Sequence, residues 1–233
     1  MTKRLSDPDF YKEFPKTCDP KDYWGQVKRT VSNKPVPESH IKMIVEAVSQ
    51  NLKISESDTL LDLCCGNGAL STFFFEQCNG GVGVDFSEYL ISIAKNEFKT
   101  RESEEYILQD VIQFLKTFQD SNRFTKALCY GAFMFLPREN AKELLMILRE
   151  RFKKINKFVI GNIPDKGKLN NFKLDKEIND IPLNDPFSPI GIWYSEDEFV
   201  EISHNAGWRC QFFRMPPTFY ASHYRYDAIL TAI

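Results

Sequence analysis

The chain has 233 residues, of which 42% are hydrophobic, so we expect one large domain with a buried core. The formal net charge of −2 at pH 7 argues against a nucleic-acid binder, which is typically basic, and no apolar run approaches the roughly 20 residues of a membrane span. The N-terminus lacks the apolar segment of a signal peptide, and the six cysteines contain no Cys-x-x-Cys pair. We therefore expect a cytoplasmic protein with reduced thiols and with neither a membrane nor a nucleic-acid partner.

Residues 1–36 are polar, rich in aromatic side chains and punctuated by proline. We expect them to form an N-terminal arm or lid, followed by one domain over residues 37–233. Trp24 lies in this arm, where it can either close over a ligand or tether a surface helix. The apolar spacing of residues 41–52 then predicts a helix with one buried face.

From residue 59 onward, strand-like and helix-like segments alternate, which predicts βαβ units and a parallel sheet. We expect strands at residues 59–63, 81–85, 106–109, 126–130 and 157–163. Helical segments are expected at residues 69–77, 87–98, 111–118 and 140–152. Ser87 is the expected capping residue of the second of these helices.

Residues 164–194 interrupt the alternation, and we expect a substrate cap whose proline-containing stretch, residues 165–192, has no regular structure. If the cap closes over a substrate, its lysines suit a phosphorylated acceptor, although a solvated loop is the alternative: Lys166, Lys168, Lys173 and Lys176. Ser195 and Glu198 then form a capping box, which predicts a helix ending at Gly207. Two strand-like runs, residues 208–213 and 226–233, complete the chain.

The most informative pattern is Asp62-x-x-x-Gly66-x-Gly68 after the first strand, with Asp85 at the end of the second. Carboxyl ends of parallel strands form the edge where open α/β sheets bind ligands. The two glycines let the backbone turn sharply and approach a ligand closely. Asp85 is then placed to accept hydrogen bonds from a ribose diol.

This pattern resembles motif I of the class I S-adenosylmethionine-dependent methyltransferases. A dinucleotide-binding fingerprint would carry a third Gly or Ala where this chain has Ser71. The resemblance implies a Rossmann-like α/β fold: a seven-stranded, mostly parallel sheet with helices on both faces and an antiparallel last strand. It also implies S-adenosylmethionine as cofactor, S-adenosylhomocysteine as product, and a small-molecule acceptor. We expect a monomer or homodimer.

The resemblance assigns roles to several residues. Asp62 would organise the loop at the methionine end of the cofactor, Asp85 would bind the ribose, and Asp110 would accept from the adenine amine. Asp110 can equally be a helix N-cap, Phe86 can belong to the core, and the turn cysteines can simply fill tight space. The expected cofactor contacts are Asp62, Cys64, Gly66, Asn67, Gly68, Asp85, Phe86, Asp110, Val111, Tyr130 and Trp24.

Tyr130 ends the fourth strand, where the methyltransferase subclasses differ. Enzymes that methylate exocyclic amines of nucleic acids carry (Asp/Asn)-Pro-Pro-(Tyr/Phe) there, and magnesium-dependent catechol-type enzymes carry a metal-binding Asp. This chain has neither pattern. We therefore expect no base methylation and no required metal.

His223 lies where an antiparallel last strand would enter from the ligand edge, and an imidazole there could take a proton from an acceptor hydroxyl. A structural role is the alternative. Tyr130 is the second catalytic candidate. The expected substrate contacts are Asn162, Asp165, Tyr220, Tyr224 and Arg225.

A narrower resemblance concerns the Tyr-Trp-Gly-Gln-Val-Lys-Arg run of the arm and the Ser-His-Tyr-Arg-Tyr-Asp run near the C-terminus. Both are similar to methyltransferases associated with bacterial surface-polysaccharide synthesis. This implies O-methylation of a sugar or of a phosphate- or phosphoramidate-linked capsule precursor, although the sequence does not separate O- from N-methylation. A nicotinamide-dependent reductase and a non-catalytic S-adenosylmethionine-binding module are the remaining alternatives.

Overall fold

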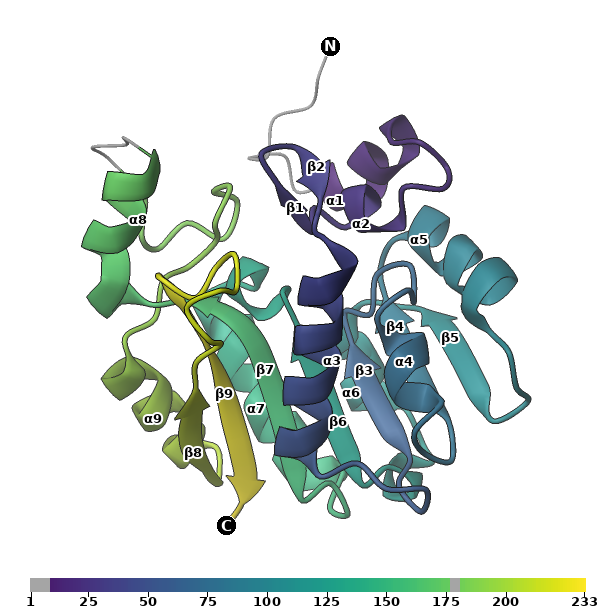
Figure 1. Cartoon of the computed structure of the whole chain (residues 1–233). Coiled ribbons are helices and arrows are strands. Elements are labelled where there is room, and N and C mark those ends of the chain that lie inside the picture. Colours follow the sequence, from purple (N-terminus) through teal and green to yellow (C-terminus); the bar gives the residue numbers. More distant parts are fainter. Residues whose placement is uncertain (1–8, 177–180) are drawn as a thin grey trace.

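In the computed structural model, residues 9–176 and 181–233 are described, apart from the side chains of residues 173–176. Within these residues, seven strands form one sheet in the order β5-β4-β3-β6-β7-β9-β8 (Figure 1). The strands β3 to β7 are parallel, and β9 is antiparallel to both of its neighbours, which confirms the expected Rossmann-like fold. Their bounds are β3 Leu60–Leu63, β4 Gly81–Asp85, β5 Glu104–Leu108, β6 Lys126–Tyr130, β7 Lys157–Pro164, β8 Trp208–Phe213 and β9 Arg225–Ala232.

Helices cover both faces of the sheet (Figure 1). One face packs against α6 (Val111–Thr117), α7 (Arg138–Arg151) and α9 (Glu196–Asn205). The other packs against α3 (Glu38–Leu52), α4 (Ser71–Phe75) and α5 (Glu88–Ile93), which continues as a π-helical turn over Ala94–Phe98.

Strand side chains alternate between these two cores, as the pleat requires. In β6, Cys129 belongs to the α7 face, whereas Leu128 and Tyr130 belong to the α3 face. At the ligand edge, successive side chains of a strand therefore point to opposite faces of the sheet.

The N-terminal arm lies above the carboxyl ends of the strands, in purple at the top of Figure 1. Its described part consists of short elements: α1 Phe10–Glu13, η1 Phe14–Thr17, α2 Tyr23–Gln26, β1 Thr30–Val31 and β2 Lys34–Pro35. The strands β1 and β2 form a small antiparallel sheet of their own.

The expectation of no regular structure over residues 165–192 was wrong for residues 166–176, whereas residues 181–192 contain only turns and bends. A short 3-10 turn, Lys166–Lys168, leads into helix α8, Leu169–Lys176. The Phe172 ring is buried against Trp193 at 5.4 Å and Tyr224 at 4.7 Å between ring centroids. This tertiary contact, rather than a local apolar pattern, stabilises the helix. Lys166 and Lys168 precede it; the side chains of Lys173 and Lys176 lie outside the described residues.

The two predicted helix caps differ in outcome. The capping box of α9 is confirmed: Ser195 Oγ accepts from Glu198 N–H at 3.1 Å, and Glu198 Oε2 accepts from Ser195 N–H at 2.8 Å. Ser87 does precede α5, but its hydroxyl makes no capping bond. Instead, its N–H donates to Asp85 Oδ1 at 2.9 Å, which places the carboxylate at this helix start.

Replacing Ser195 by alanine is expected to lower the free energy of unfolding by about 1 kcal/mol, because the N–H of Glu198 loses its acceptor. For a chain of this length that corresponds to a melting temperature lower by about 2–4 °C. Thermal unfolding followed by circular dichroism measures it, and Ser195→Asp, which keeps an acceptor, is the control. An unchanged melting temperature for Ser195→Ala would contradict the structural role of this cap.

Among the described residues, no helix combines the length and the apolar character needed to span a bilayer.

Candidate functional site

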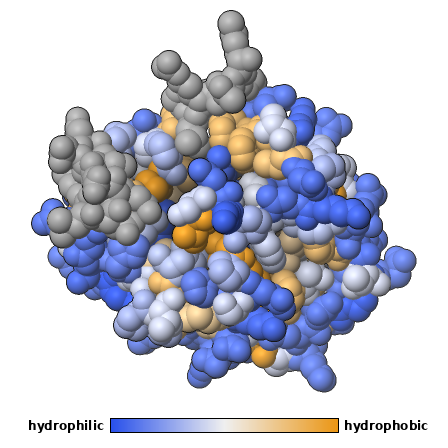
Figure 2. Space-filling model, turned by 45° about the horizontal axis from the view of Figure 1, so that its top comes forward, coloured by the Kyte–Doolittle hydropathy of each residue, from blue (hydrophilic) through white to orange (hydrophobic). Residues whose placement is uncertain are grey.

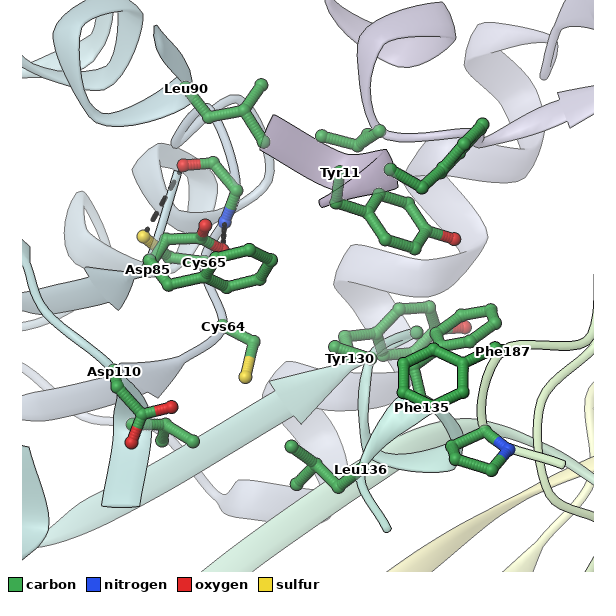
Figure 3. A pocket seen from close by; sticks show the side chains of 18 of the residues that line it. Tyr11, Cys64, Cys65, Asp85, Leu90, Asp110, Tyr130, Phe135, Leu136 and Phe187 are labelled. Carbon is green, nitrogen blue, oxygen red and sulfur yellow. Dashed lines mark hydrogen bonds between the residues drawn. The ribbon is translucent and has the colours of Figure 1, made fainter. Parts of the chain in front are cut away.

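Two adjoining cavities open at the carboxyl edge of the sheet, within the described part of the chain. We call the first the turn cavity; it has about 290 Å³ and is bounded by the glycine turn, Cys64 to Gly66, and by the ends of β4, β5 and β6 (Figure 3). We call the second the arm cavity; it has about 740 Å³ and is bounded by residues 27–33 of the arm and by residues near the C-terminus. Figure 2, which brings this edge forward, shows apolar residues exposed among hydrophilic ones.

The cavities share a set of wall residues, so a ligand in one can touch a ligand in the other. The shared residues come from the arm, the end of β6 and the stretch before α9: Tyr11, Val27, Gly131, Phe135 and Ser188. Burial raises the pKa of Tyr11, so this phenol stays protonated at neutral pH.

Gly66 and Gly68 have no room for a side chain. Gly66 adopts φ +60°, and a Cβ there would lie 2.9 Å from Val27 Cγ1 of the arm. Gly68 adopts φ +77°, and a Cβ there would lie 3.0 Å from both Ala94 and Tyr106. Position 66 therefore requires glycine because the arm approaches it, and position 68 requires glycine because it packs against the π-helical turn and β5.

Asp85 places a carboxylate at the end of β4, on the wall of the turn cavity (Figure 3). Its Oδ2 accepts from Gly66 N–H at 2.9 Å, and its Oδ1 accepts from Ser87 N–H at 2.9 Å. Burial raises the pKa of Asp85, and these two hydrogen bonds oppose the rise. A carboxylate has about four acceptor positions, so it can still receive a pair of hydroxyls.

Asp62 lies behind the turn, 4% exposed, outside the walls of both cavities. Ser71 Oγ donates to its Oδ2 at 2.6 Å. Burial raises the pKa of Asp62 to about 7, against the opposing effects of this hydrogen bond and of Arg29. Ser71 stands where a dinucleotide-binding fingerprint would carry Gly or Ala, and here it donates the hydrogen bond that the buried Asp62 carboxylate requires.

Asp110 and Phe86 both line the turn cavity. Asp110 Oδ1 accepts from the N–H groups of Ile112 and Gln113, each at 3.0 Å, so it is the N-cap of α6 as well as a wall residue beside Val111. The Phe86 side chain is 38% exposed, so it is a cavity wall rather than a core residue. Cys64 also lines this cavity, with its backbone at φ +61°.

Asn67 ties the turn to the arm. Its Nδ2 donates to the carbonyl of Tyr23 and to Gln26 Oε1, both at 2.8 Å. Trp24 lies in the same helix, α2, with its ring 5.5 Å from the Arg29 guanidinium. Asn67 and Trp24 both lie behind the cavity walls, so the structure places them where they hold the arm in position.

Replacing Asn67 by alanine is therefore expected to loosen the arm. The loss of two buried hydrogen bonds is worth on the order of 1–3 kcal/mol of local stability, or about tenfold or more in amide protection. Hydrogen exchange read by mass spectrometry over residues 23–29 checks this. Unchanged exchange in the arm would mean that its contacts elsewhere are sufficient.

Tyr130 lines both the turn cavity and a separate small space of about 10 Å³, which is about the room that one water molecule needs. Asn162, Arg225 and Asp227 line the same space. In the described part of the chain, the Tyr130 hydroxyl and Asp227 Oδ2 have no hydrogen-bond partner. Burial raises the pKa of Tyr130 well above its usual value.

Asp227 holds a bulge between β7 and β9. The register of the two strands shifts between Ile160 and Ile163, and Asn162 takes φ +64° there. Asp227 Oδ1 accepts from Asn162 N–H at 2.7 Å, which satisfies the donor that the bulge releases. Burial raises the pKa of Asp227 to about 7.

Four of the five expected substrate residues line the arm cavity, together with His223: Asn162, Tyr220, Tyr224 and Arg225. Asp165 does not join them. It is 3% exposed, and its oxygens accept from Arg214 Nη2 at 2.6 Å and from Gly167 N–H at 2.7 Å. Its carboxylate stabilises the start of the segment after β7.

Sequence reasoning missed Arg29, which reaches the arm cavity from the arm and donates from Nη2 to the carbonyl of Tyr130 at 3.4 Å. The Lys-Arg pair that follows α2 was the available signal. It also missed Tyr11 and Phe135, whose rings lie 5.4 Å apart across the junction of the cavities. That contact joins segments far apart in the chain and leaves no local pattern.

The comparisons with known proteins find similarity to methyltransferases. Residues 60–154 match the family described as "Methyltransferase domain". An uncharacterized methyltransferase of Schizosaccharomyces pombe, C70.08c, is 33% identical over 76 residues, which span 33% of this chain and only 27% of that protein.

Solved structures share the fold at low sequence identity. Magnesium protoporphyrin IX methyltransferase from Synechocystis PCC 6803, solved with S-adenosylhomocysteine, has a TM-score of 0.64 and 15% identity, covering 96% of each chain. The small RNA methyltransferase HEN1 has a TM-score of 0.61 and 15% identity, covering 82% of this chain and 25% of that one.

Proposed function

From the fold and from the methyltransferase-domain match at residues 60–154, we propose that the chain is a class I S-adenosylmethionine-dependent methyltransferase and that it methylates a small molecule. The observation that carries the proposal is the pair of adjoining cavities. The turn cavity has a carboxylate at a strand end, and the larger arm cavity shares walls with it. A volume of about 740 Å³ is in the range of small-molecule sites.

The turn cavity fits S-adenosylmethionine. In this proposal Asp85 accepts from the ribose hydroxyls, and Asp110 accepts from the adenine amine with its second oxygen. Phe86, Val111 and Cys64 supply apolar walls. When bound, S-adenosylmethionine supplies an electrophilic methyl group on a sulfonium.

The residues that do not line the turn cavity shape it from behind. Asp62 and Ser71 fix the strand end below the turn. Gly68 packs closely against Ala94 and Tyr106, and Asn67 holds the arm above the turn. Trp24 acts through the same arm. These are positioning roles, because their side chains reach the ligand only through other residues.

The described parts of the arm (residues 9–36) and of the cap (residues 164–176 and 181–194) would act by alignment and by excluding water from the acceptor. Methyl transfer to a neutral oxygen or nitrogen needs close in-line positioning, and positioning supplies much of the rate of a bimolecular transfer. Tyr11 and Gly131 stand where the two cavities meet. In this proposal His223, on the wall of the arm cavity, takes a proton from an acceptor hydroxyl, and Tyr220, whose phenol stays protonated, contributes to the same wall.

The finer proposal is O-methylation of a sugar or of a surface-polysaccharide precursor, with a phosphate or phosphoramidate linkage. It is supported by the resemblance of the arm and of the C-terminal run to methyltransferases of that pathway, and by the volume of the arm cavity, which suits a small acceptor. The mild net charge favours a small acceptor over a nucleic acid. Action in the cytoplasm as a monomer or homodimer belongs to the same proposal.

The proposal is tested by following the label of methyl-labelled S-adenosylmethionine. Purified protein is incubated separately with the small-molecule, RNA and protein fractions of the host cell, and S-adenosylhomocysteine formation is measured in each. Label is expected in the small-molecule fraction and should be lost in Asp85→Ala. Label in RNA or protein would overturn the acceptor class. Cofactor binding without S-adenosylhomocysteine formation in any fraction would indicate a non-catalytic binding module.

A further inference from the structure

The arm cavity carries positive charge that no ion pair neutralises. Among the described residues, its charged walls are Lys28, Arg29 and Arg225, besides the titratable His223, and no Asp or Glu lines it. None of these three cations lies within 4.0 Å of a carboxylate in the described part of the chain. The Lys28 ammonium makes a cation–π contact instead, with its Nζ 3.8 Å from the centre of the Phe14 ring. The two arginines are therefore the charges that a ligand in this cavity would meet.

Each guanidinium is held in place without being neutralised. Arg29 donates to the carbonyl of Tyr130, and its guanidinium carbon lies 5.5 Å from the centre of the Tyr130 ring. Arg225 donates to the carbonyl of Asn162, and its guanidinium lies 4.8 Å from the centre of the Tyr224 ring. A guanidinium has five N–H donors, so both retain donors for a ligand.

Arg29 and Arg225 lie far apart in the sequence, but both affect the electrostatics of Tyr220. Arg29 belongs to the arm, and Arg225 begins β9. Both lower the pKa of Tyr220, although burial has the larger and opposite effect on that phenol. A Cβ at Gly131 would lie 3.6 Å from Arg29 Nη2 and 3.8 Å from Asn162 Nδ2, so an amide donor stands beside the first guanidinium.

Both arginines are only partly exposed, and charges out of bulk water are normally paired. We propose that an oxyanion of the acceptor, a phosphoryl or a carboxylate group, binds between Arg29 and Arg225, with Asn162 Nδ2 as a neutral third donor. Planar guanidinium forks match both oxyanions through paired hydrogen bonds. This inference rests on the proposed function, in which the arm cavity holds the acceptor, and it identifies that acceptor as an acid.

The test is a calorimetric titration of the full chain, saturated with S-adenosylhomocysteine, with inorganic phosphate in one arm and malonate in the other. Saturable binding of at least one anion is expected, and the tighter of the two identifies the oxyanion. Arg29→Gln and Arg225→Gln should each weaken that binding about tenfold or more, because a charge-assisted pair is lost. Arg209→Gln, which removes an exposed positive charge on β8, should change it less than twofold.

Two controls separate a failure of this inference from a failure of the proposed function. S-adenosylhomocysteine affinity is measured first for every variant; an absence of binding to the wild type would overturn the proposed function itself. Arg29→Lys and Arg225→Lys keep the charge and should retain part of the anion affinity if a Gln variant proves unfolded. Intact S-adenosylhomocysteine binding with no saturable anion binding, or with equal anion affinity in the Arg29, Arg225 and Arg209 variants, would overturn the inference alone.

Discussion

Replacing Asp85 by alanine is expected to weaken S-adenosylhomocysteine binding by about 100-fold or more, as measured by calorimetric titration. The variant loses charge-assisted hydrogen bonds to the ribose, each worth about 1.5–3 kcal/mol, and 100-fold corresponds to about 2.7 kcal/mol. It also leaves the N–H groups of Gly66 and Ser87 without their acceptor, which loosens the turn itself.

The conservative variant separates these two contributions. Asp85→Asn keeps one carbonyl acceptor but no charge, so its affinity should lie between those of the wild type and Asp85→Ala. Asp120→Ala, which removes an exposed aspartate next to the turn Ser121–Arg123, is the matched control and should bind as the wild type does. An Asp85→Ala protein that binds S-adenosylhomocysteine with wild-type affinity would exclude the role proposed for this carboxylate.

The second large effect concerns pH and Asp227. Burial raises its pKa from 3.8 to about 7 in the folded protein. The folded state therefore holds a proton that the unfolded state releases, and stability from this group is present below pH 3.8 and lost as pH rises through about 7. Between about pH 5 and pH 8 the loss is on the order of 2–3 kcal/mol.

Urea unfolding of the wild type and of Asp227→Asn at several pH values measures this linkage. Asparagine does not titrate and keeps an acceptor for the N–H of Asn162, so the variant should gain stability relative to the wild type as pH rises. Asp62, whose pKa burial also raises to about 7, adds a similar slope to both proteins and cancels in the difference. A stability difference that is constant across this range would mean that Asp227 is ionised in the folded protein.

The sequence predicted the sheet well because its signals are local. A short buried strand that is followed by a glycine turn, as at β3, or that ends in aspartate, as at β4, leaves little choice of structure or of ligand edge. The helix in residues 169–176 was missed because its stability comes from the packing of Phe172 on Trp193 and Tyr224, which are distant in the chain.

The residues of the candidate site were predictable only where they stand at the end of a strand. Asp85 and Asp110 do, and both line the turn cavity. Asp165 also follows a strand, but Arg214 from a distant segment binds its carboxylate. Arg29 follows no strand at all: it reaches the cavity because the arm is anchored through Asn67. A bulge such as that at Asn162 depends on the partner strand β9 and cannot be recognised in one strand alone.

The central claim is that the turn cavity holds S-adenosylmethionine and that its methyl group faces the arm cavity. A crystal structure of the protein with S-adenosylhomocysteine tests it most directly. The account predicts the ribose on Asp85, the adenine between Phe86 and Asp110, and the sulfur towards Gly131, where the two cavities meet. Density for the ligand in the arm cavity, or a ribose away from Asp85, would contradict it.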